Sequence, residues 1–162
     1  IRLAPDGELL VRGPLLFDGY FGDPGATEAA LHDGWYATGD LAEVDEEGYL
    51  TVTGRVGEVI RTGGEAVVPS EVEAALAEHP SVDDVAVIGL PDPDWGEVVC
   101  AAVVLAPQRA ELTLTDLRSF LEGRIAPFKQ PRRLVLVDAV PRTPSTLQVQ
   151  RRLLLEQVLD QG

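Results

Sequence analysis

The chain has 162 residues, of which 45% are hydrophobic, and it carries a net charge of −14. This length allows one complete domain and part of another, and the composition is that of an ordinary globular protein rather than a disordered one. The acidic balance excludes general nucleic-acid binding, which needs lysine and arginine at the phosphates, and no apolar run approaches the roughly 20 residues of a membrane helix.

The first 55 residues predict short strands around one short helix. Strands are expected at residues 8–12, 34–40, 41–44 and 49–53. Asp23-Pro24-Gly25 predicts a turn that leads into a helix over residues 26–31, and Gly48 suits the tight turn of a hairpin formed by the last two strands. Because these strands lack an obvious core of their own, we interpret residues 1–55 as the end of a larger domain.

Residues 56–162 predict a compact α+β domain with helices packed on one sheet. Strands are expected at residues 59–60, 66–68, 82–90, 98–105 and 134–137, and helices at residues 70–79, 115–125 and 151–159. Ser70 and Thr115 are the expected N-caps of the first two helices. Residues 82–90 and residues 98–105 are each apolar enough for a central strand, and Pro91-Asp92-Pro93-Asp94 predicts the loop between them.

Charge and cysteine content add further limits. Residues 1–100 carry four basic and 21 acidic side chains, whereas residues 101–162 carry nine basic and six acidic ones. We interpret the acidic half as a solubilising surface and expect a phosphate-rich ligand to prefer the basic tail. The single cysteine, Cys100, excludes an internal disulfide and fits the cytoplasm. Since the sequence starts at Ile1 and contains no methionine, we expect it to be part of a longer protein.

Several short motifs follow one another in a fixed order along the chain. They are G-W-Y-A-T-G-D-L at residues 34–41, G-R at 54–55, R-T-G-G-E at 61–65 and P-S-E-V-E at 69–73. This series resembles the closing motifs of the adenylate-forming acyl-CoA synthetases of the AMP-binding superfamily, and the resemblance extends from about residue 7 to residue 152. It implies a compact, mobile C-terminal domain over residues 56–162, preceded by the β-rich end of the large N-terminal domain over residues 1–55.

The resemblance also implies a reaction and its cofactors. These enzymes use ATP, with Mg²⁺, to convert a carboxylic acid into an acyl-AMP, and CoA then displaces AMP to give a thioester. The ATP-phosphate loop and the acyl pocket of the family lie upstream of this sequence. We therefore expect the chain to act only with the rest of the N-terminal domain, on a carboxylic acid that these residues do not specify.

Two residues of these motifs are candidates for nucleotide binding. In the family the aspartate of T-G-D-L binds the ATP ribose, which assigns this role to Asp40; a solvated turn aspartate is the alternative. Arg55 is similar to the family arginine near the ribose and phosphates, and its planar guanidinium suits such oxygens. A surface ion pair of Arg55 with Glu47 or Glu58 is the alternative. Two residues later, Gly57 occupies the family's hinge position, where Asp or Lys is usual; a plain loop glycine is equally compatible.

The candidate thioester loop is Gly63-Gly64-Glu65. Two adjacent glycines let the backbone approach a pantetheine arm that side chains would block. Lys129 and Arg132 belong to a segment that resembles the family's F-K-x-P-R, and they are candidates for the CoA phosphates or for a solvated basic face. Trp95-Gly96-Glu97 matches the family's W-G-E, and we expect Trp95 to cap the sheet in a mainly structural role.

One departure from the family affects adenylation. Residues 141–145 match the segment that leads to the family's G-K, whose lysine neutralises charge on the acyl phosphate. Without a gap the lysine position falls on Leu147; with one inserted residue, which aligns Gln150-Arg151 with the family's Q-R, it falls on Gln148. Since neither alignment supplies a lysine, we expect adenylation to be slow and thioester formation to be less affected.

Three alternatives for the parent protein therefore remain open. It is an acyl-CoA synthetase, a ligase that loads a phosphopantetheinyl carrier protein, or a degenerate homologue that binds an acyl-adenylate or a partner without catalysis. His32 and His79 lack the neighbours of a metal site, and His79 fits the end of a helix. Cys100 lies in an apolar strand and is expected to be inert.

Overall fold

The computed structural model describes residues 1–109 and 111–160 and divides into two compact units, Ile1–Gly57 and Glu58–Gly162. A short 3₁₀ helix, η1 (Val56–Glu58), contains the division. No helix in the described ranges is long and apolar enough to cross a membrane.

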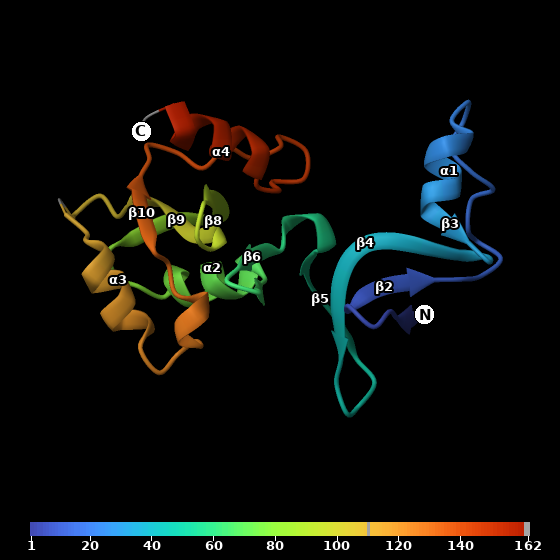
Figure 1. Ribbon diagram of the computed structural model, residues 1–162, viewed down its shortest axis with the longest axis horizontal. Coiled ribbons are helices and arrows are strands. Elements are labelled where there is room, and N and C mark those ends of the chain that lie inside the picture. The colour runs from blue at the N-terminus through green and yellow to red at the C-terminus, as the bar shows by residue number, and fades with distance from the viewer. Residues whose placement is uncertain (110, 161–162) are drawn as a thin grey trace. The chain divides into compact units, whose positions relative to one another are not determined.

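The first unit is an antiparallel sheet with one short helix beside it (Figure 1). Its strands are β1 (Arg2–Leu3), β2 (Glu8–Val11), β3 (Leu31–His32), β4 (Trp35–Val44) and β5 (Leu50–Arg55), and its helix is α1 (Pro24–Ala30). The strand order is β1-β2-β4-β3, with β5 paired to β4. The expected β4–β5 hairpin is confirmed, and Gly48 takes a φ of +88° in its turn.

The helix of the first unit begins earlier than expected. Residues 23–25 were expected to form a turn, but Pro24 is already helical because Asp23 is the N-cap and accepts a hydrogen bond from the Ala26 amide at 2.9 Å. Pro24 suits the first helical turn, where its missing N–H leaves no bond unmade. The helix ends at Ala30, and Leu31–His32 forms β3 instead of a last turn.

Few apolar side chains are buried in the first unit. Leu9, Leu41 and Ala42 are buried there, and every other buried apolar side chain of residues 1–109 and 111–160 belongs to the second unit. The large side chains that the first unit exposes are Ile1, Leu15, Phe17, Tyr20, Phe21, Val44, Tyr49, Leu50 and Val52. As the sequence predicted, these strands have very little core of their own.

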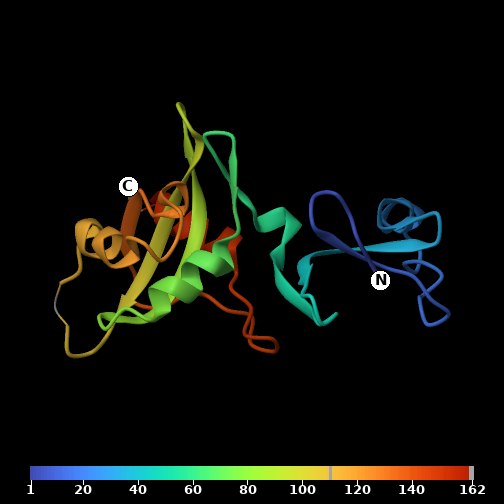
Figure 2. The ribbon, with the colours of Figure 1, turned by 90° about the horizontal axis from the view of Figure 1, so that it is seen from below.

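The second unit is a mixed sheet covered by helices on both faces (Figures 1 and 2). Its strands are β6 (Ile60–Thr62), β7 (Glu65–Val67), β8 (Val82–Asp92), β9 (Gly96–Leu105) and β10 (Arg133–Leu136). Its helices are α2 (Pro69–Ala77), α3 (Leu114–Leu121) and α4 (Arg151–Asp160), with the 3₁₀ turn η2 (Pro127–Lys129). The predicted α+β fold and its β-β-α-β-β-α-β-α order are confirmed.

Alternation along β8 and β9 explains the three layers. Val85 and Val87 of β8 face α2 and α3 through Leu76 and Leu117, in a core that also includes Val99 of β9. The intervening residues point the other way, toward Leu154 and Val158 of α4. Residues 85–90, after Asp83 and Asp84, therefore form a continuous apolar run although β8 pairs only with β9 among the described strands. The prediction of a central strand is confirmed for β9 and was wrong for β8, whose apolar sequence is explained by burial on both faces.

Three further local predictions were wrong. The N-cap of α2 is Val68, which has no side-chain acceptor, and Pro69 occupies the first turn ahead of Ser70. The N-cap of α3 is Thr113 rather than Thr115, because Thr113 and Asp116 form a reciprocal capping box. The loop expected at residues 91–94 is shorter, since β8 continues to Asp92 and the turn to β9 is tight.

Arg151, at the start of α4, connects four segments of the second unit. Its guanidinium donates to Glu58 at 2.7 Å, to Glu73 of α2 at 2.6 Å and to the Val87 carbonyl at 3.2 Å. Glu73 in turn accepts from the Val87 amide at 2.7 Å. Burial by itself would lower the pKa of Arg151, but the hydrogen bonds and the charges of Glu73 and Glu58 outweigh burial and raise it. The network satisfies both backbone groups of Val87 on the side of β8 away from β9.

Replacing Arg151 with methionine is expected to destabilise the second unit by about 3 kcal/mol, because Glu73 would remain largely buried without its partner. Urea unfolding followed by circular dichroism measures the change. Arg152→Met is the matched control: its side chain is 93% exposed and lies 3.8 Å from Glu156, so little change is expected. Equal losses in the two variants would contradict a special role for Arg151.

Candidate functional site

Asp40 and Arg55 form an ion pair in the first unit. The two residues are directly opposite each other in the β4–β5 ladder, and Arg55 Nε lies 2.8 Å from Asp40 Oδ1. Arg55 Nη1 also donates to the Thr38 carbonyl at 3.3 Å. The Arg55 side chain is 49% exposed and that of Asp40 27%, so both remain accessible to a ligand. The alternative pairing of Arg55 with Glu58 is wrong, because Glu58 binds Arg151.

A break in the β2–β4 ladder fixes the conformation of Thr38-Gly39-Asp40. The register shifts between Glu8 and Leu10, and Gly39 takes a φ of +73°, which glycine adopts without strain. The Gly39 amide donates to the Glu8 carboxylate at 2.8 Å, and the Thr38 hydroxyl donates to the Leu9 carbonyl at 2.8 Å and accepts from the Asp40 amide at 3.1 Å. These side chains replace the missing ladder bonds and hold Asp40 in place.

Sequence reasoning did not assign roles to Glu8 or Thr38. Thr38 belongs to the T-G-D-L motif and was a recognisable candidate for a supporting residue. Glu8 gave no signal, because only the strand pairing brings it beside Gly39.

A small aromatic group packs nearby. The ring centroid of Phe17 lies 5.0 Å from that of Tyr20 and 5.3 Å from that of Tyr36. A hydrogen bond with Tyr20, and then burial, raises the pKa of Tyr36, so its phenol is protonated at neutral pH.

Gly57 lies in η1, at the end of the first unit. A Cβ atom built at Gly57 would have no heavy atom within 4 Å, so its surroundings leave the backbone room to move. Glu58, the next residue, is fixed to the second unit by its 2.7 Å contact with Arg151. The division between the two units therefore falls directly before a residue that is bound to the second unit.

Gly63 and Gly64 form the two-residue turn of the β6–β7 hairpin. Their φ angles are +59° and +89°, and Thr62 and Glu65 pair across the turn. Successive left-handed residues are characteristic of the type I′ turn, which favours glycine at both positions. A Cβ on Gly63 would lie 2.5 Å from Trp95 Cε3, whereas one on Gly64 would meet nothing within 4 Å. Gly63 therefore also provides the space that the indole ring occupies.

Trp95 and Arg132 stack beside this turn. The Arg132 guanidinium carbon lies 3.7 Å from the centroid of the Trp95 ring, within the range of a cation–π contact. Trp95 is 42% exposed, and its ring lies against Gly63 and the Arg132 guanidinium. Lys129 is bound elsewhere, since its ammonium contacts both carboxylate oxygens of Glu71 at 2.6 and 2.7 Å. The structure thus brings Arg132, but not a free Lys129 ammonium, to the candidate thioester loop.

Leu147 and Gln148 lie in a closed loop before α4. The Thr143 amide donates to the Gln148 carbonyl and the Leu147 amide to the Thr143 carbonyl, both at 2.9 Å. Arg142 Nη1 donates to the Leu147 carbonyl at 3.0 Å. Leu147 takes a φ of +57°, a left-handed conformation that is unfavourable for a leucine, and its side chain points into solvent with 67% exposure.

The remaining titratable residues belong to local structure. His79 follows α2, accepts from the Ser81 amide through Nδ1 at 3.1 Å and contacts the Phe120 ring, and burial lowers its pKa. Burial raises the pKa of the Cys100 thiol to about 12, which keeps it unreactive. Within residues 1–109 and 111–160, no three His, Cys, Asp or Glu side chains are grouped in a way that could hold a metal ion.

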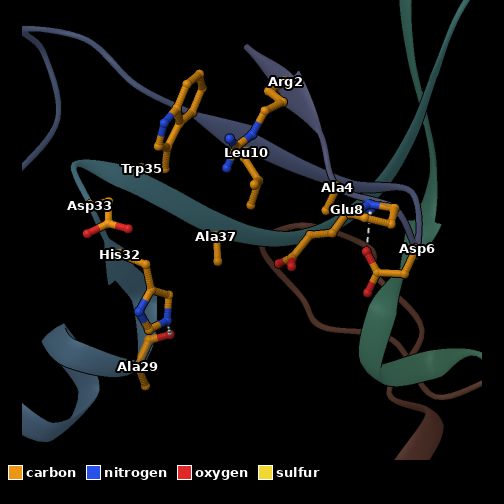
Figure 3. A pocket seen from close by; sticks show the side chains of 11 residues that line it. Arg2, Ala4, Asp6, Glu8, Leu10, Ala29, His32, Asp33, Trp35 and Ala37 are labelled. Atoms are coloured by element: carbon orange, nitrogen blue, oxygen red, sulfur yellow. Dashed lines mark hydrogen bonds between the residues drawn. The ribbon is translucent and has the colours of Figure 1, made fainter.

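A hollow of 790 Å³ lies in the first unit, apart from the Asp40–Arg55 pair (Figure 3). Arg2, Asp6, Glu8, His32, Asp33 and Trp35 line it together with small and apolar residues. The Arg2 guanidinium carbon lies 4.6 Å from the centroid of the Trp35 ring, and His32 Nε2 donates to the Ala29 carbonyl at 3.0 Å. None of the residues proposed for nucleotide binding, the hinge, the thioester loop or the CoA phosphates lines this hollow, so it is not the candidate site.

Part of the chain matches a protein family, and most of it is similar in sequence to parts of several enzymes. Residues 71–146 match the family described as AMP-binding enzyme C-terminal domain. The indoleacetate–CoA ligase of Aromatoleum aromaticum is 47% identical over 143 residues, which cover 88% of this chain and 28% of that enzyme.

Two solved structures share the fold. ATP-bound MatB from Rhodopseudomonas palustris matches 95% of this chain and 30% of its own, with 38% identity and a TM-score of 0.85. The o-succinylbenzoate CoA synthetase MenE of Bacillus subtilis, in complex with its acyl-adenylate intermediate, matches 91% of this chain and 30% of its own, with 35% identity and a TM-score of 0.80. The chain thus spans less than a third of each of these proteins.

Gly63→Ala is expected to cost more stability than Gly64→Ala, although both residues have left-handed backbones. Gly64→Ala adds only backbone strain, roughly 1 kcal/mol, whereas Gly63→Ala also displaces the indole of Trp95. Urea unfolding gives the two free energies, and Trp95 fluorescence in a Trp35→Phe background reports the ring. In a Trp95→Ala background the two alanine variants should cost the same; a persistent difference would contradict the contact as its cause.

His79 is expected to make the stability depend on pH. Because burial lowers its folded-state pKa below the ordinary 6.5, the folded chain binds fewer protons than the unfolded chain in this range. The contribution of His79 is therefore complete above pH 6.5 and is lost as pH falls through the folded-state pKa. The stability difference between the parent chain and His79→Gln should shrink from pH 7.5 to pH 5.5; a constant difference would contradict the shift.

Proposed function

Since residues 71–146 belong to the AMP-binding enzyme C-terminal domain family, we propose that the whole chain is the C-terminal part of an ATP-dependent acyl-CoA synthetase. The complete enzyme converts a carboxylic acid and ATP into an acyl-AMP and pyrophosphate. CoA then attacks the acyl carbon, and AMP leaves as the thioester forms. This activity requires the rest of the N-terminal domain, so the present chain alone contributes only some of the residues. A cytoplasmic location fits its single buried cysteine.

We assign residues 1–55 to the end of the large N-terminal domain and residues 56–162 to the mobile C-terminal domain. The small buried core of the first unit and its many exposed apolar side chains support the first assignment. The division of the chain at Gly57, with Glu58 held by Arg151, supports a hinge at Gly57. Glycine at this position permits rotation of the backbone without a steric penalty.

The candidate nucleotide-binding residues and the candidate thioester loop lie on different units, and this distribution carries the proposal. The accessible carboxylate of Asp40 belongs to the first unit and suits a ribose diol, with Arg55 beside it for ribose or phosphate oxygens. The glycine turn Gly63-Gly64-Glu65 belongs to the second unit. Rotation of one unit about Gly57 would allow the enzyme to carry out adenylation and thioester formation in turn. ATP enters with Mg²⁺ as its counterion, and AMP leaves.

The thiol substrate is best matched by CoA. Its pantetheine arm suits the narrow glycine turn, and Arg132 stacked on Trp95 offers both a flat surface and a positive charge for its nucleotide. Lys129 would contribute only after leaving Glu71. A phosphopantetheinyl carrier protein presents the same arm without that nucleotide, so the Arg132–Trp95 stack favours CoA. Direct comparison of the two acceptors with the full-length parent tests this choice.

The loop conformation favours one alignment of the missing lysine. Glycine readily adopts the left-handed conformation that Leu147 takes, so we infer that Leu147 occupies the position of the family glycine and Gln148 that of the lysine. Gln148 carries no charge to neutralise the acyl phosphate. The first half-reaction should therefore be slow, which also keeps the degenerate, non-catalytic homologue as the second candidate function.

Restoring the lysine at Gln148 is expected to increase ATP–pyrophosphate exchange by the full-length parent about 10²-fold or more, the usual effect of one electrostatic contact in a transition state. The variants are Gln148→Lys, the double variant Leu147→Gly with Gln148→Lys, and Leu147→Lys as the matched control. Indoleacetate, the acid named in the relative with 47% identity, is the first substrate to test.

The outcomes separate the candidate functions. A gain with Gln148→Lys, greatest in the double variant, supports both the synthetase and the alignment. A gain with Leu147→Lys alone means that the ungapped alignment is correct. Fast exchange by the unaltered parent contradicts the importance of the missing charge. Succinylbenzoate and ferulate, the acids named in two further similar ligases, are tested beside indoleacetate. If no folded variant exchanges pyrophosphate with any of the three acids, the result supports the non-catalytic homologue.

A further inference from the structure

Glu97 links the β6–β7 hairpin to the rest of the sheet. Backbone pairing between β6 and β9 is limited to Thr62 and Gly96. Beyond that pair, the Arg61 amide donates to the Glu97 carboxylate at 2.7 Å, and the Gly63 amide donates to the Trp95 carbonyl at 2.9 Å. On the edge of β6 that faces β9, the Glu97 side chain thus takes the place of a backbone acceptor.

The structure reserves space for this carboxylate. Gly89 of β8 faces it, and a Cβ built on Gly89 would lie 2.5 Å from Glu97 Oε1, 2.9 Å from its Cδ and 3.2 Å from Ile60. Gly89 has no left-handed φ, so its backbone conformation does not require glycine. The missing side chain at Gly89 is therefore explained by the position of Glu97. Two separate features therefore define the position of the Glu97 carboxylate. It accepts the hydrogen bond of the Arg61 amide, and it occupies the space left by the missing side chain of Gly89.

A hydrogen bond to a charged acceptor is stronger than one between neutral groups. This one acts on the strand that leads directly into Gly63 and Gly64, and few backbone bonds hold that strand to β9. We propose that Glu97 is a positioning residue for thioester formation, acting through the Arg61 amide to hold the Gly63-Gly64 turn in place. The proposal rests on the proposed function for its catalytic consequence; its structural part can be tested without that function.

Hydrogen exchange in the 162-residue chain tests the structural part. Glu97→Ala should speed exchange of the Arg61 and Gly63 amides about tenfold, the effect of losing one hydrogen bond to a charged group. Glu97→Gln keeps an oxygen acceptor and should restore most of the protection. Ala102 in β9 is the internal control, and its exchange should not change. Equal exchange at Arg61 in the parent chain and Glu97→Ala would overturn the proposal.

Gly89→Ala gives an independent test from the opposite side. Its new methyl group would push the carboxylate away, so it should expose the Arg61 amide as Glu97→Ala does. In the double variant Gly89→Ala with Glu97→Ala the methyl group meets no carboxylate, so the two effects should not add. Additive effects would mean that Gly89 and Glu97 act separately, which contradicts the reserved space.

Thioester formation by the full-length parent tests the catalytic part. Synthetic indoleacetyl-AMP, succinylbenzoyl-AMP and feruloyl-AMP are supplied with CoA, which bypasses adenylation. Glu97→Ala should lower kcat about tenfold while the KM for CoA stays within about twofold, because misplacement of a turn that does not hold the nucleotide affects the reacting geometry. Glu97→Gln should recover kcat; a general loss of folding would not give this recovery.

The two parts fail in different ways. If Glu97→Ala loosens the hairpin but thioester formation is unchanged, positioning for catalysis is overturned while the synthetase remains. If the unaltered parent makes no thioester from any of the three adenylates, the proposed function fails, and hydrogen exchange still decides whether Glu97 holds the hairpin.

Discussion

The second unit depends on one buried cation. Arg151 at the start of α4 binds Glu58 of η1, Glu73 of α2 and the carbonyl of Val87 in β8, so a single guanidinium joins segments separated by up to 93 residues in sequence. Arginine suits this position because its planar group donates several hydrogen bonds at once and retains its charge when buried. Removing a partner would leave a carboxylate with little access to water, which is why such a network is difficult to replace piece by piece. It also attaches Glu58, the residue directly after Gly57, to the second unit.

The two candidate sites are built on similar principles. In each, a carboxylate accepts a backbone N–H close to a glycine with a left-handed backbone: Glu8 binds the Gly39 amide in the first unit, and Glu97 binds the Arg61 amide, two residues before Gly63, in the second. A glycine at such a site has no side chain to pack and a flexible backbone, and both properties weaken the sheet around it. Carboxylate acceptors from neighbouring strands restore order at these points without adding side chains over the glycines.

Much of this arrangement could be predicted from the sequence. The order of elements in the second unit follows from apolar periodicity, and the resemblance of the motifs to those of a known family singled out Asp40, Arg55 and the Gly63-Gly64 turn as candidates. Strand order could not be read in this way, because a strand buried on both faces has the same composition at an edge as at the centre. Caps were misplaced where two candidates lie close together: Thr113 and Thr115 are both suitable, and only the reciprocal bond with Asp116 separates them. The partners of Glu8 and Glu97 depend on strand register, which one sequence does not reveal.

The bonds around Val87 have a consequence for the behaviour of the chain in concentrated solution. An edge strand with free N–H and C=O groups is a template for adding a strand from another molecule, a common first step in aggregation. At Val87 of β8 these groups are already taken by Glu73 and Arg151. An incoming strand would first have to displace two charged side chains, so this edge of the second unit is closed to self-association at this point.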